Sequence, residues 1–334
     1  MVYVTEKDYL RAVDWSKVED EMDLKVWRRA NTNQWLPEKI ALSKDRRPWT
    51  TLTESEQNIT MRVFGGLTLL DSTQTQVGCR ALLNYCLTPH EDSVLTQFDY
   101  MEAVHTQTYS SIFMTLTGTS LIASTFRWVE SDRCLQKKAR LIVDAYQSED
   151  PLKVRVASVF LESFLFYSGF YWPLYLLSRN LLTATATAIK LIIRDEAVHG
   201  FYIGYKFRQV FAKESPARKK EIMDYAYDLM MELYANEVEY TEQMYGSVGL
   251  EDDVGAFLRL NANKAFSNLG FAELFPAEEC QVNPAILRAM RSDSKAVHDF
   301  FSIEGSAYFI PTFEDTENSD WECSDADDRL SVYA

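Results

Sequence analysis

The sequence is poor in the residues that interrupt helices. It contains 12 glycines and 9 prolines among 334 residues, and most of them fall between stretches with helical periodicity. No stretch shows the alternation of apolar and polar residues that is typical of a β-strand. Because 47% of the residues are hydrophobic, the chain can bury a large core, either as one domain of long helices or as two ordinary domains. The predicted fold class is all-α.

Cysteines are also few, and their spacing excludes two kinds of site. The five are Cys79, Cys86, Cys134, Cys280 and Cys323. None belongs to a C-x-x-C pair, so neither a disulfide framework nor a thiolate zinc site is expected. The N-terminus has no basic segment followed by an apolar one, and no window reaches the roughly 18 apolar residues of a membrane span. We therefore expect a cytoplasmic protein that does not cross a membrane.

Positive charge is scarce as well. Lysine and arginine number 34 against 49 aspartates and glutamates, which gives a net charge of −15. A nucleic-acid partner requires clustered basic residues, and an anionic membrane surface requires the same. Both partners are excluded on this ground. The chain also has no glycine-rich phosphate loop, so we do not expect it to bind nucleotides alone.

Helical periodicity extends to about residue 269. Thr53 and Glu56 have the spacing of a capping box, which predicts a helix from Thr53 to about Leu87. The further predicted helices are 92–118, 120–147, 151–180, 183–212, 215–247 and 251–269. Pro173 is expected to kink or interrupt the helix that contains it. Helices of this length favour a bundle, and no change in composition precedes residue 310, so residues 1–310 are predicted to form one helical domain.

Residues 311–334 have a different composition. Eight acidic residues occur there against the single Arg329: Glu314, Asp315, Glu317, Asp320, Glu322, Asp325, Asp327 and Asp328. Such a segment cannot bury itself, and we expect a disordered acidic tail. Trp321 is the exception in it, either as an aromatic that docks on a partner or as a randomly exposed side chain.

Two of the four histidines follow a glutamate by three residues. These pairs are Glu102 with His105 and Glu196 with His199. Residues i and i+3 lie on one face of a helix, so each pair directs a carboxylate and an imidazole to a common point. The other two histidines, in the same sequence, resemble loop or helix-end residues without ligand partners: His90 and His298.

Both pairs lie on apolar helix faces. Phe98 and Tyr109 flank the first pair, and Ile192 and Ile203 flank the second. A carboxylate on an apolar face is costly unless it is paired or binds a metal ion. The tyrosine lies one turn beyond His105, which places its phenol close to the same point.

Two further carboxylates sit at positions expected to be buried, and they complete a set on four helices. The set is Asp71, Glu102, His105, Glu162, Glu196 and His199. Ferritin-like dinuclear carboxylate proteins use this kind of set, with glutamate where this chain has Asp71. Oxygen-rich ligands with imidazole suit iron or manganese better than zinc, and two divalent ions would neutralise four carboxylates. The alternative is that these residues form satisfied polar pairs in a bundle core.

Most of the chain resembles one family, the small (β, radical-generating) subunit of class I ribonucleotide reductase, and within it the class Ib type. The resemblance rests on WLPEKI at 35–40, GLTLLD at 66–71, MEAVH at 101–105 with Tyr109, LESFLFYSGFY at 161–171 and IIRDEAVHG at 192–200. It implies a ferritin-like long-helix bundle. It also implies that Asp71, Glu102 and His105 bind one metal ion and that Glu162, Glu196 and His199 bind the other, with Glu102 among the bridging carboxylates.

The same resemblance implies that Tyr109 carries a stable radical in an apolar pocket. The pocket residues are Phe166, Phe170 and Ile192. Without the resemblance, a simple core tyrosine would be the better interpretation of Tyr109, because the chain has 18 tyrosines.

A route for the radical is implied too. Trp35 and Asp195 match the internal relay, with Asp195 accepting from the free N–H of His105. Tyr308 resembles the tail tyrosine that passes the radical across, and Trp321 the aromatic that anchors the tail in the large subunit. Class Ib tails usually end near that aromatic, whereas this chain continues for residues 323–334. The alternative anchors in this extension are Leu330 and Tyr333.

The resemblance implies the small subunit of a class Ib ribonucleoside-diphosphate reductase. A dinuclear manganese or iron centre, oxidised by O₂ or by superoxide from a flavodoxin-like activating protein, generates and stores the tyrosyl radical. The radical passes to the large (alpha) subunit, which reduces ribonucleotides to deoxyribonucleotides. A homodimer is expected. The alternative is a stand-alone ferritin-like di-metal oxidase or monooxygenase, which has no use for Trp35, Tyr308 or the tail. Iron storage requires a shorter bundle.

Overall fold

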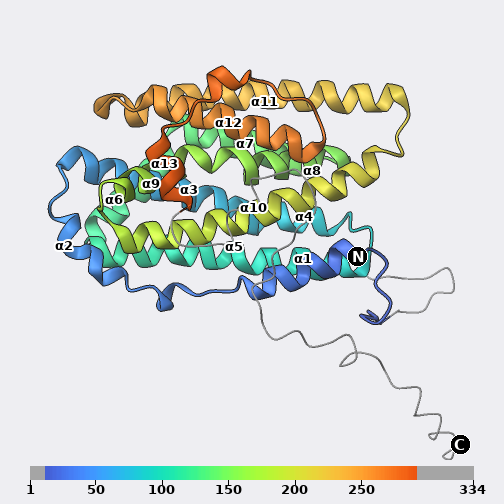
Figure 1. Cartoon of the computed structure of the whole chain (residues 1–334), viewed down its shortest axis with the longest axis horizontal. Coiled ribbons are helices and arrows are strands. Elements are labelled where there is room, and N and C mark those ends of the chain that lie inside the picture. The colour runs from blue at the N-terminus through green and yellow to red at the C-terminus, as the bar shows by residue number, and fades with distance from the viewer. Residues whose placement is uncertain (1–11, 292–334) are drawn as a thin grey trace, which may run out of the picture. The chain divides into compact units, whose positions relative to one another are not determined.

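The computed structural model describes residues 12–291, and those residues are helical with no β-strand (Figure 1). The helices are α1 (Glu21–Thr32), α2 (Arg46–Trp49), α3 (Glu54–Thr73), α4 (Cys79–Leu83), α5 (Pro89–Leu116), α6 (Thr119–Ser131), α7 (Arg133–Tyr146), α8 (Pro151–Phe160), α9 (Tyr167–Ser178), α10 (Thr183–Phe211), α11 (Pro216–Tyr245), α12 (Glu251–Leu269) and α13 (Pro284–Arg291). Two π segments occur, Gln74–Gly78 and Leu161–Leu165. The 3₁₀ turns are Pro37–Lys39, Leu42–Asp45, Gly246–Val248 and Ala277–Cys280. The all-α prediction is confirmed.

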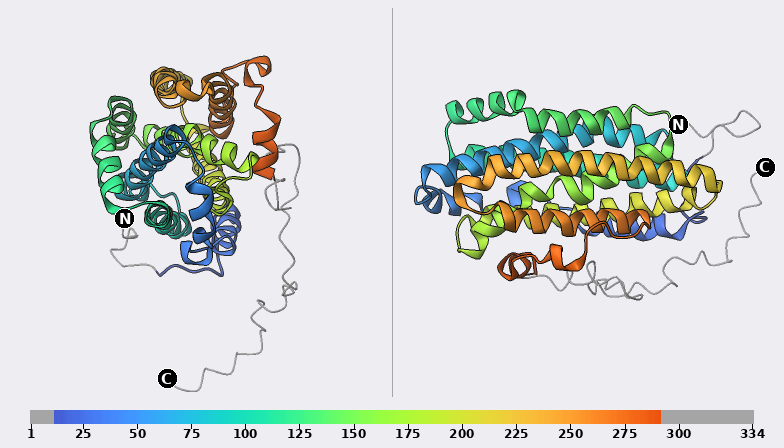
Figure 2. Two further views of the ribbon diagram at one scale, coloured as in Figure 1. Left: turned by 90° about the vertical axis from the view of Figure 1, so that its left-hand side faces the viewer. Right: turned by 90° about the horizontal axis from the view of Figure 1, so that it is seen from above.

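Residues 12–290 belong to one compact unit. Its long helices run roughly along one common axis, and several are seen nearly end-on in the left view of Figure 2. α3 packs on α5, and α10 packs on α8 and α9. These elements enclose the core, while α11 and α12 cover it from one side. The predicted domain end at residue 310 and the predicted tail, 311–334, lie outside the described residues.

The long helices begin where capping side chains are available. Thr53 accepts from the Glu56 N–H at 3.2 Å, and the Glu56 carboxylate accepts from the Thr53 N–H at 2.9 Å. This is the predicted capping box, and it satisfies two backbone donors that the first turn of α3 leaves unpaired. Asp150 and Thr88 cap α8 and α5 in the same way, each followed by a proline at the first helical position.

Two predicted helices are wrong in their extent, and of the two effects predicted for Pro173 the interruption does not occur. The stretch 120–147 is two helices, because Asp132 adopts an extended backbone and its side chain accepts from the Leu135 N–H to start α7. The helix predicted to reach Leu87 ends at Leu83. Pro173 does not interrupt its helix, since α9 continues to Ser178. The α-helical geometry of the predicted helix 151–180 is interrupted earlier, by the π segment Leu161–Leu165.

Two further findings bear on the sequence predictions. Within residues 12–291, no helix is long and apolar enough to cross a membrane. The four cysteines in that range are free: Cys79, Cys86, Cys134 and Cys280.

Candidate metal centre

Four elements of the bundle bring the six predicted ligands together. α3 supplies Asp71, α5 supplies Glu102 and His105, the second π segment supplies Glu162, and α10 supplies Glu196 and His199. None of the six side chains is more than 2% exposed. The i, i+3 spacing places each glutamate and histidine on the inner face of its helix, as the helical period requires.

The six side chains form two overlapping groups of four. The first is Asp71, Glu102, His105 and Glu196, and the second is Glu102, Glu162, Glu196 and His199; within each group one ligand atom per residue lies within 4.8 Å of the others. Glu102 and Glu196 belong to both groups. Such an overlap would allow the six residues to hold two ions side by side, with Glu102 and Glu196 near both.

The two shared carboxylates each direct one oxygen at each histidine. Glu102 Oε2 lies 3.4 Å from His105 Nδ1, and Glu102 Oε1 lies 2.8 Å from His199 Nδ1. For Glu196 the corresponding distances are 3.1 Å from Oε1 to His105 Nδ1 and 3.3 Å from Oε2 to His199 Nδ1. Asp71 and Glu162 each approach one histidine alone, at 3.8 Å and 3.6 Å. Asp71 and His105 therefore lie at one end of the cluster, Glu162 and His199 at the other, and Glu102 and Glu196 between them.

The ligand atoms have no ordinary hydrogen-bond partners among the described residues. Both oxygens of Asp71, Glu102 and Glu196, one oxygen of Glu162 and Nδ1 of both histidines are buried and unsatisfied. Buried polar groups are normally paired, and a cluster of unpaired ones calls for an explanation such as an ion. A set of oxygen and imidazole donors is chemically suited to two divalent ions of the iron or manganese type.

The protonation of the cluster reflects this concentration of negative charge. Burial, followed by the neighbouring Glu102, raises the pKa of Asp71 and of Glu162 well above the usual range. Burial alone would lower the pKa of His105 and His199, but the surrounding carboxylates raise both well above the ordinary histidine value. Without metal, therefore, the cluster retains protons that bound ions would displace.

Tyr109 is fully buried beside this cluster. Its hydroxyl has no hydrogen-bond partner among the described residues, and burial followed by the Asp71 charge raises its pKa well above the usual value. Phe64 stacks on it with ring centroids 6.0 Å apart. Sequence reasoning did not assign Phe64 to this pocket, although it lies seven residues before Asp71 on the same face of α3.

The three predicted pocket residues are also fully buried. Phe166 and Phe170 stack on each other at 5.7 Å, and Ile192 lies on α10 one turn before Glu196. Phe64 adds an aromatic ring stacked on Tyr109 to these three predicted positions.

A hydrogen-bonded chain leads from the cluster toward the surface. His105 Nε2 lies 3.4 Å from Asp195 Oδ2, and Trp35 Nε1 donates to the same oxygen at 2.7 Å. Trp35 and His105 stack with ring centroids 6.1 Å apart. Trp35 is half-buried, in the segment before the turn Pro37–Lys39. Arg194 donates to the other oxygen of Asp195 at 3.3 Å, which holds that carboxylate in place.

Gln74 is hydrogen-bonded to the cluster, and the sequence did not indicate this contact. Its Nε2 donates to Glu162 Oε1 at 2.5 Å and to Ser158 Oγ at 3.2 Å. Tyr146 donates in turn to Gln74 Oε1 at 2.6 Å. Gln74 begins the first π segment and Glu162 lies in the second. Short π segments are frequent at functional sites, and here both shape the same end of the cluster.

Of the remaining predicted positions, His90 is the one within the described residues, and it does not belong to the cluster. His90 lies at the start of α5, where its Nε2 is 3.2 Å from the Asp14 carbonyl oxygen and its ring contacts Trp15 at 4.7 Å. The others fall outside the described residues: His298, Tyr308, Trp321, Leu330 and Tyr333.

Comparisons with known proteins point in one direction. Residues 12–284 match the family model for the ribonucleotide reductase small chain. The chain is 52% identical over 315 residues to ribonucleoside-diphosphate reductase subunit beta nrdF2 of Mycobacterium tuberculosis (strain ATCC 25618 / H37Rv), covering 94% of this chain and 97% of that protein. It is 51% identical over 312 residues to ribonucleoside-diphosphate reductase 2 subunit beta of Escherichia coli (strain K12), covering 93% and 98%.

A solved structure shares the fold as well. The crystal structure of dimanganese(II)-NrdF from Streptococcus sanguinis matches with a TM-score of 0.82 and 44% sequence identity, over 84% of this chain and all of that one.

Proposed function

Because the chain belongs to the ribonucleotide reductase small chain family and is a beta-type subunit of ribonucleoside-diphosphate reductase, we propose a role in that reaction for each of its site residues. The family implies pairing with a large subunit and a homodimer of the small one. The proposal is that the buried cluster would hold two metal ions, that Tyr109 carries the radical, and that the radical leaves through Trp35 for the large subunit.

One observation carries the proposal: Glu102 and Glu196 each face both histidines. Carboxylates that present one oxygen to each of two histidine-containing groups could help to hold an ion in each group, so the residues would hold two ions side by side. We assign Asp71, Glu102, His105 and Glu196 to one ion and Glu102, Glu162, Glu196 and His199 to the other. Two divalent ions offset the four negative charges, which makes the burial of so many carboxylates tolerable.

Tyr109 is the proposed site of the radical. When bound, the dinuclear centre supplies the oxidising power that removes one electron from the phenol. The neutral radical also requires loss of the phenolic proton, and the Asp71 carboxylate, whose charge together with burial raises the pKa of this hydroxyl, is the proposed acceptor. Phe64 and the unpaired state of the hydroxyl support a long radical lifetime, because they keep hydrogen donors away.

Trp35 is the proposed exit from the site. The same Asp195 oxygen contacts the indole N–H of Trp35 and the His105 ring, so a change of charge at His105 alters the hydrogen bond of Trp35. Trp35 is half-buried, so in the hydrogen-bonded series His105–Asp195–Trp35 it is the member nearest to the surface. Beyond it, we propose transfer through Tyr308 and docking of the tail 311–334 on the large subunit, both from sequence alone.

Manganese with a flavodoxin-like activating protein is the proposed loading in the cell. The solved structure at 44% identity is a dimanganese(II) protein, and the ligand types of this cluster suit manganese as well as iron. On this proposal the manganese-loaded protein forms no radical with O₂ alone and forms it when the reduced flavoprotein is added. Radical formation by the manganese protein with O₂ alone would remove the need for that partner.

Turnover with a class Ib large subunit tests the function. The metal-loaded protein is mixed with that subunit, and reduction of a ribonucleoside diphosphate is measured for the wild type, Tyr109→Phe and Tyr171→Phe. Tyr171 is an equally buried tyrosine whose hydroxyl donates to Asp253 at 3.2 Å, away from the cluster. We expect Tyr109→Phe to abolish turnover and Tyr171→Phe to retain it. Turnover by Tyr109→Phe at the wild-type rate would overturn the proposal.

A further inference from the structure

The two cluster histidines differ in what lies behind them. Both direct Nδ1 at the carboxylates. His105 has a protein acceptor for its other ring nitrogen, since Nε2 lies 3.4 Å from Asp195 Oδ2. For Nε2 of His199 the described residues provide no comparable hydrogen bond, and Phe98 covers one face of the ring at a centroid distance of 4.1 Å. Histidines that bind metal almost always donate their second N–H to a carboxylate, a carbonyl or a water.

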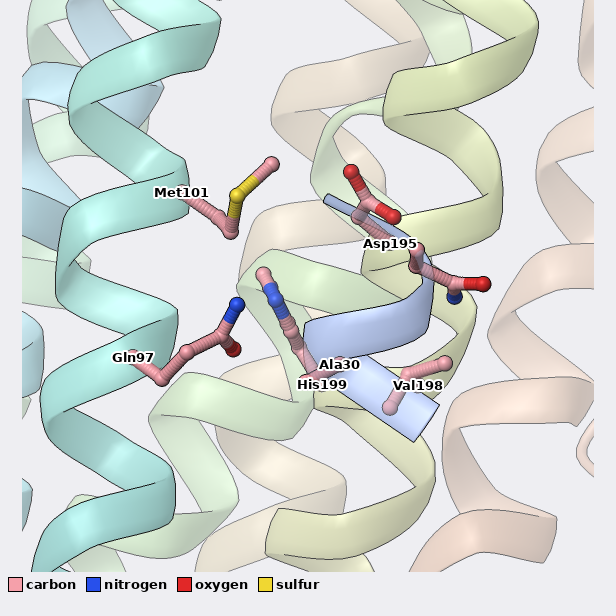
Figure 3. A pocket seen from close by; sticks show the side chains of 7 residues that line it. Ala30, Gln97, Met101, Asp195, Val198 and His199 are labelled. Carbon is pink, nitrogen blue, oxygen red and sulfur yellow. The ribbon is translucent and has the colours of Figure 1, made fainter. Parts of the chain in front are cut away.

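A small cavity lies beside the His199 imidazole, between α1, α5 and α10 (Figure 3). Its lining residues are Ala30, Asn33, Gln97, Met101, Asp195, Val198 and His199. Its volume is about 10 Å³, which is roughly the minimum space that one water molecule needs. The size therefore selects a single water over any larger ligand.

Two buried amides in this lining are unsatisfied. Gln97 and Asn33 are each 7% exposed. Both amide atoms of Gln97 and the Nδ2 of Asn33 have no hydrogen-bond partner among the described residues. In Figure 3 the Gln97 side chain extends from α5 toward the His199 imidazole. A buried amide without hydrogen-bond partners is costly. A polar molecule in this cavity could form hydrogen bonds with both amides.

We propose that this cavity is a hydration site that orients His199. The inference rests on the proposed function, because a metal ion on Nδ1 fixes the imidazole proton on Nε2. One water accepts a hydrogen bond from His199 Nε2–H and donates one to Gln97 Oε1, with the Asn33 amide as a further donor. Three polar partners are typical of a buried water. Gln97 thereby becomes a positioning residue for His199, as Asp195 is for His105.

A crystal structure of the manganese-loaded protein tests the site directly. We expect one ordered water within hydrogen-bond distance of both His199 Nε2 and the Gln97 amide. Metal and water are read separately from the density. A dry cavity overturns this inference whether or not metal is bound, whereas an ordered water without manganese on the histidines counts against the proposed function and not against the hydration site.

Two variants test the positioning role. Gln97→Leu removes the amide, and Met101→Leu changes another lining residue on the same helix while leaving both amides. We expect Gln97→Leu to weaken Mn²⁺ binding about tenfold at the His199 position, visible as lower manganese occupancy there than at the His105 position by anomalous scattering. Met101→Leu should match the wild type. Equal loss at both positions, or equal loss in both variants, would assign the effect to packing and overturn the role of Gln97.

Discussion

At the scale of single residues, the chemistry of the site depends on four carboxylates and two histidines, with Gln74 hydrogen-bonded to Glu162 and Gln97 beside His199. The two Glu-x-x-His pairs were predictable because helical spacing puts both members on one face, and the structure indeed brings them to one buried point. Gln74, Gln97 and Asn33 were not predictable. Amide side chains have no sequence spacing that marks them as part of a site. The contacts of these three amides depend on which side chains the packing of the helices places opposite them.

The metal content of two histidine variants tests the ligand assignment. His105→Ala removes one imidazole from the cluster, and we expect bound manganese to fall from two ions per chain to one or fewer. His90→Ala is the matched control, because His90 is an equally buried histidine on α5 that contacts Trp15 and not the carboxylates. Metal analysis of the purified proteins gives the answer. Two ions per chain in His105→Ala would show that the assignment is wrong.

At the scale of elements, the sequence predicted the long helices but not their irregularities. Both π segments escaped prediction because one wider turn of five residues barely alters an apolar pattern read over a whole helix. The break at Asp132 was missed for a related reason. Helical periodicity continues on both sides of it, so only the extended backbone and the cap on Leu135 reveal two helices.

Close packing of α10 on α12 depends on Gly204. A Cβ atom at this position would lie 2.4 Å from the Asn268 backbone oxygen, and backbone cannot move aside as a side chain can. We expect Gly204→Ala to lower the free energy of unfolding by about 1–3 kcal/mol and to reduce metal retention, since α10 carries Glu196 and His199. In Gly255→Ala the new Cβ would meet only Arg259 Nη1 at 3.5 Å. That control should be neutral or stabilised; equal destabilisation of both would contradict the packing argument.

The attachment of α1 to α10 gives a prediction about pH. Asp20 caps α1 at the Met22 N–H, and its other oxygen accepts from Lys206 at 2.8 Å. Burial alone would raise the pKa of Asp20, but the hydrogen bonds from Lys206 and the Met22 N–H lower it overall. The charged form therefore stabilises the fold above the unfolded value of about 4, and this contribution is lost as the pH falls through the lower folded pKa.

Asp20→Asn isolates that charge, because asparagine is an equally good N-cap. We expect it to cost about 1 kcal/mol at pH 7, measured by chemical denaturation of the full chain. The difference from the wild type should be constant above about pH 5 and should narrow as the pH falls below the unfolded value of about 4. A difference that stays constant below about pH 4, down to the pH at which the Asp20 carboxyl is fully protonated, would show that the Asp20 charge contributes nothing.

For the whole molecule, the fold and the cluster were accessible from sequence because buried carboxylates on apolar faces restrict the options severely. The tail was accessible only as composition. Its eight acidic residues and Trp321 lie outside the described residues, so its role stays a prediction. The alternative of a stand-alone oxidase found no support, because the relatives at about half identity span nearly the whole chain and are named as reductase subunits.

Truncation separates radical formation from its use. We expect a protein without residues 309–334 to form the Tyr109 radical normally and to lose turnover with the large subunit. A shorter truncation, without residues 323–334, is the control for the anchor: retained turnover favours Trp321, and lost turnover favours Leu330 or Tyr333. Full turnover after the longer truncation would remove the tail from the mechanism.

The central claim is that this cluster oxidises Tyr109, and electron paramagnetic resonance tests it most directly. Metal-free protein is loaded anaerobically with Fe²⁺, exposed to O₂ and frozen, in parallel with Tyr109→Phe. We expect a tyrosyl radical signal in the wild type and none in the variant, although both bind two ions. The same signal in Tyr109→Phe would contradict the assignment of the radical to Tyr109. The absence of any organic radical would also contradict it, whether the wild-type protein holds two irons and is exposed to O₂ or holds two manganese ions and is exposed to the reduced flavoprotein and O₂.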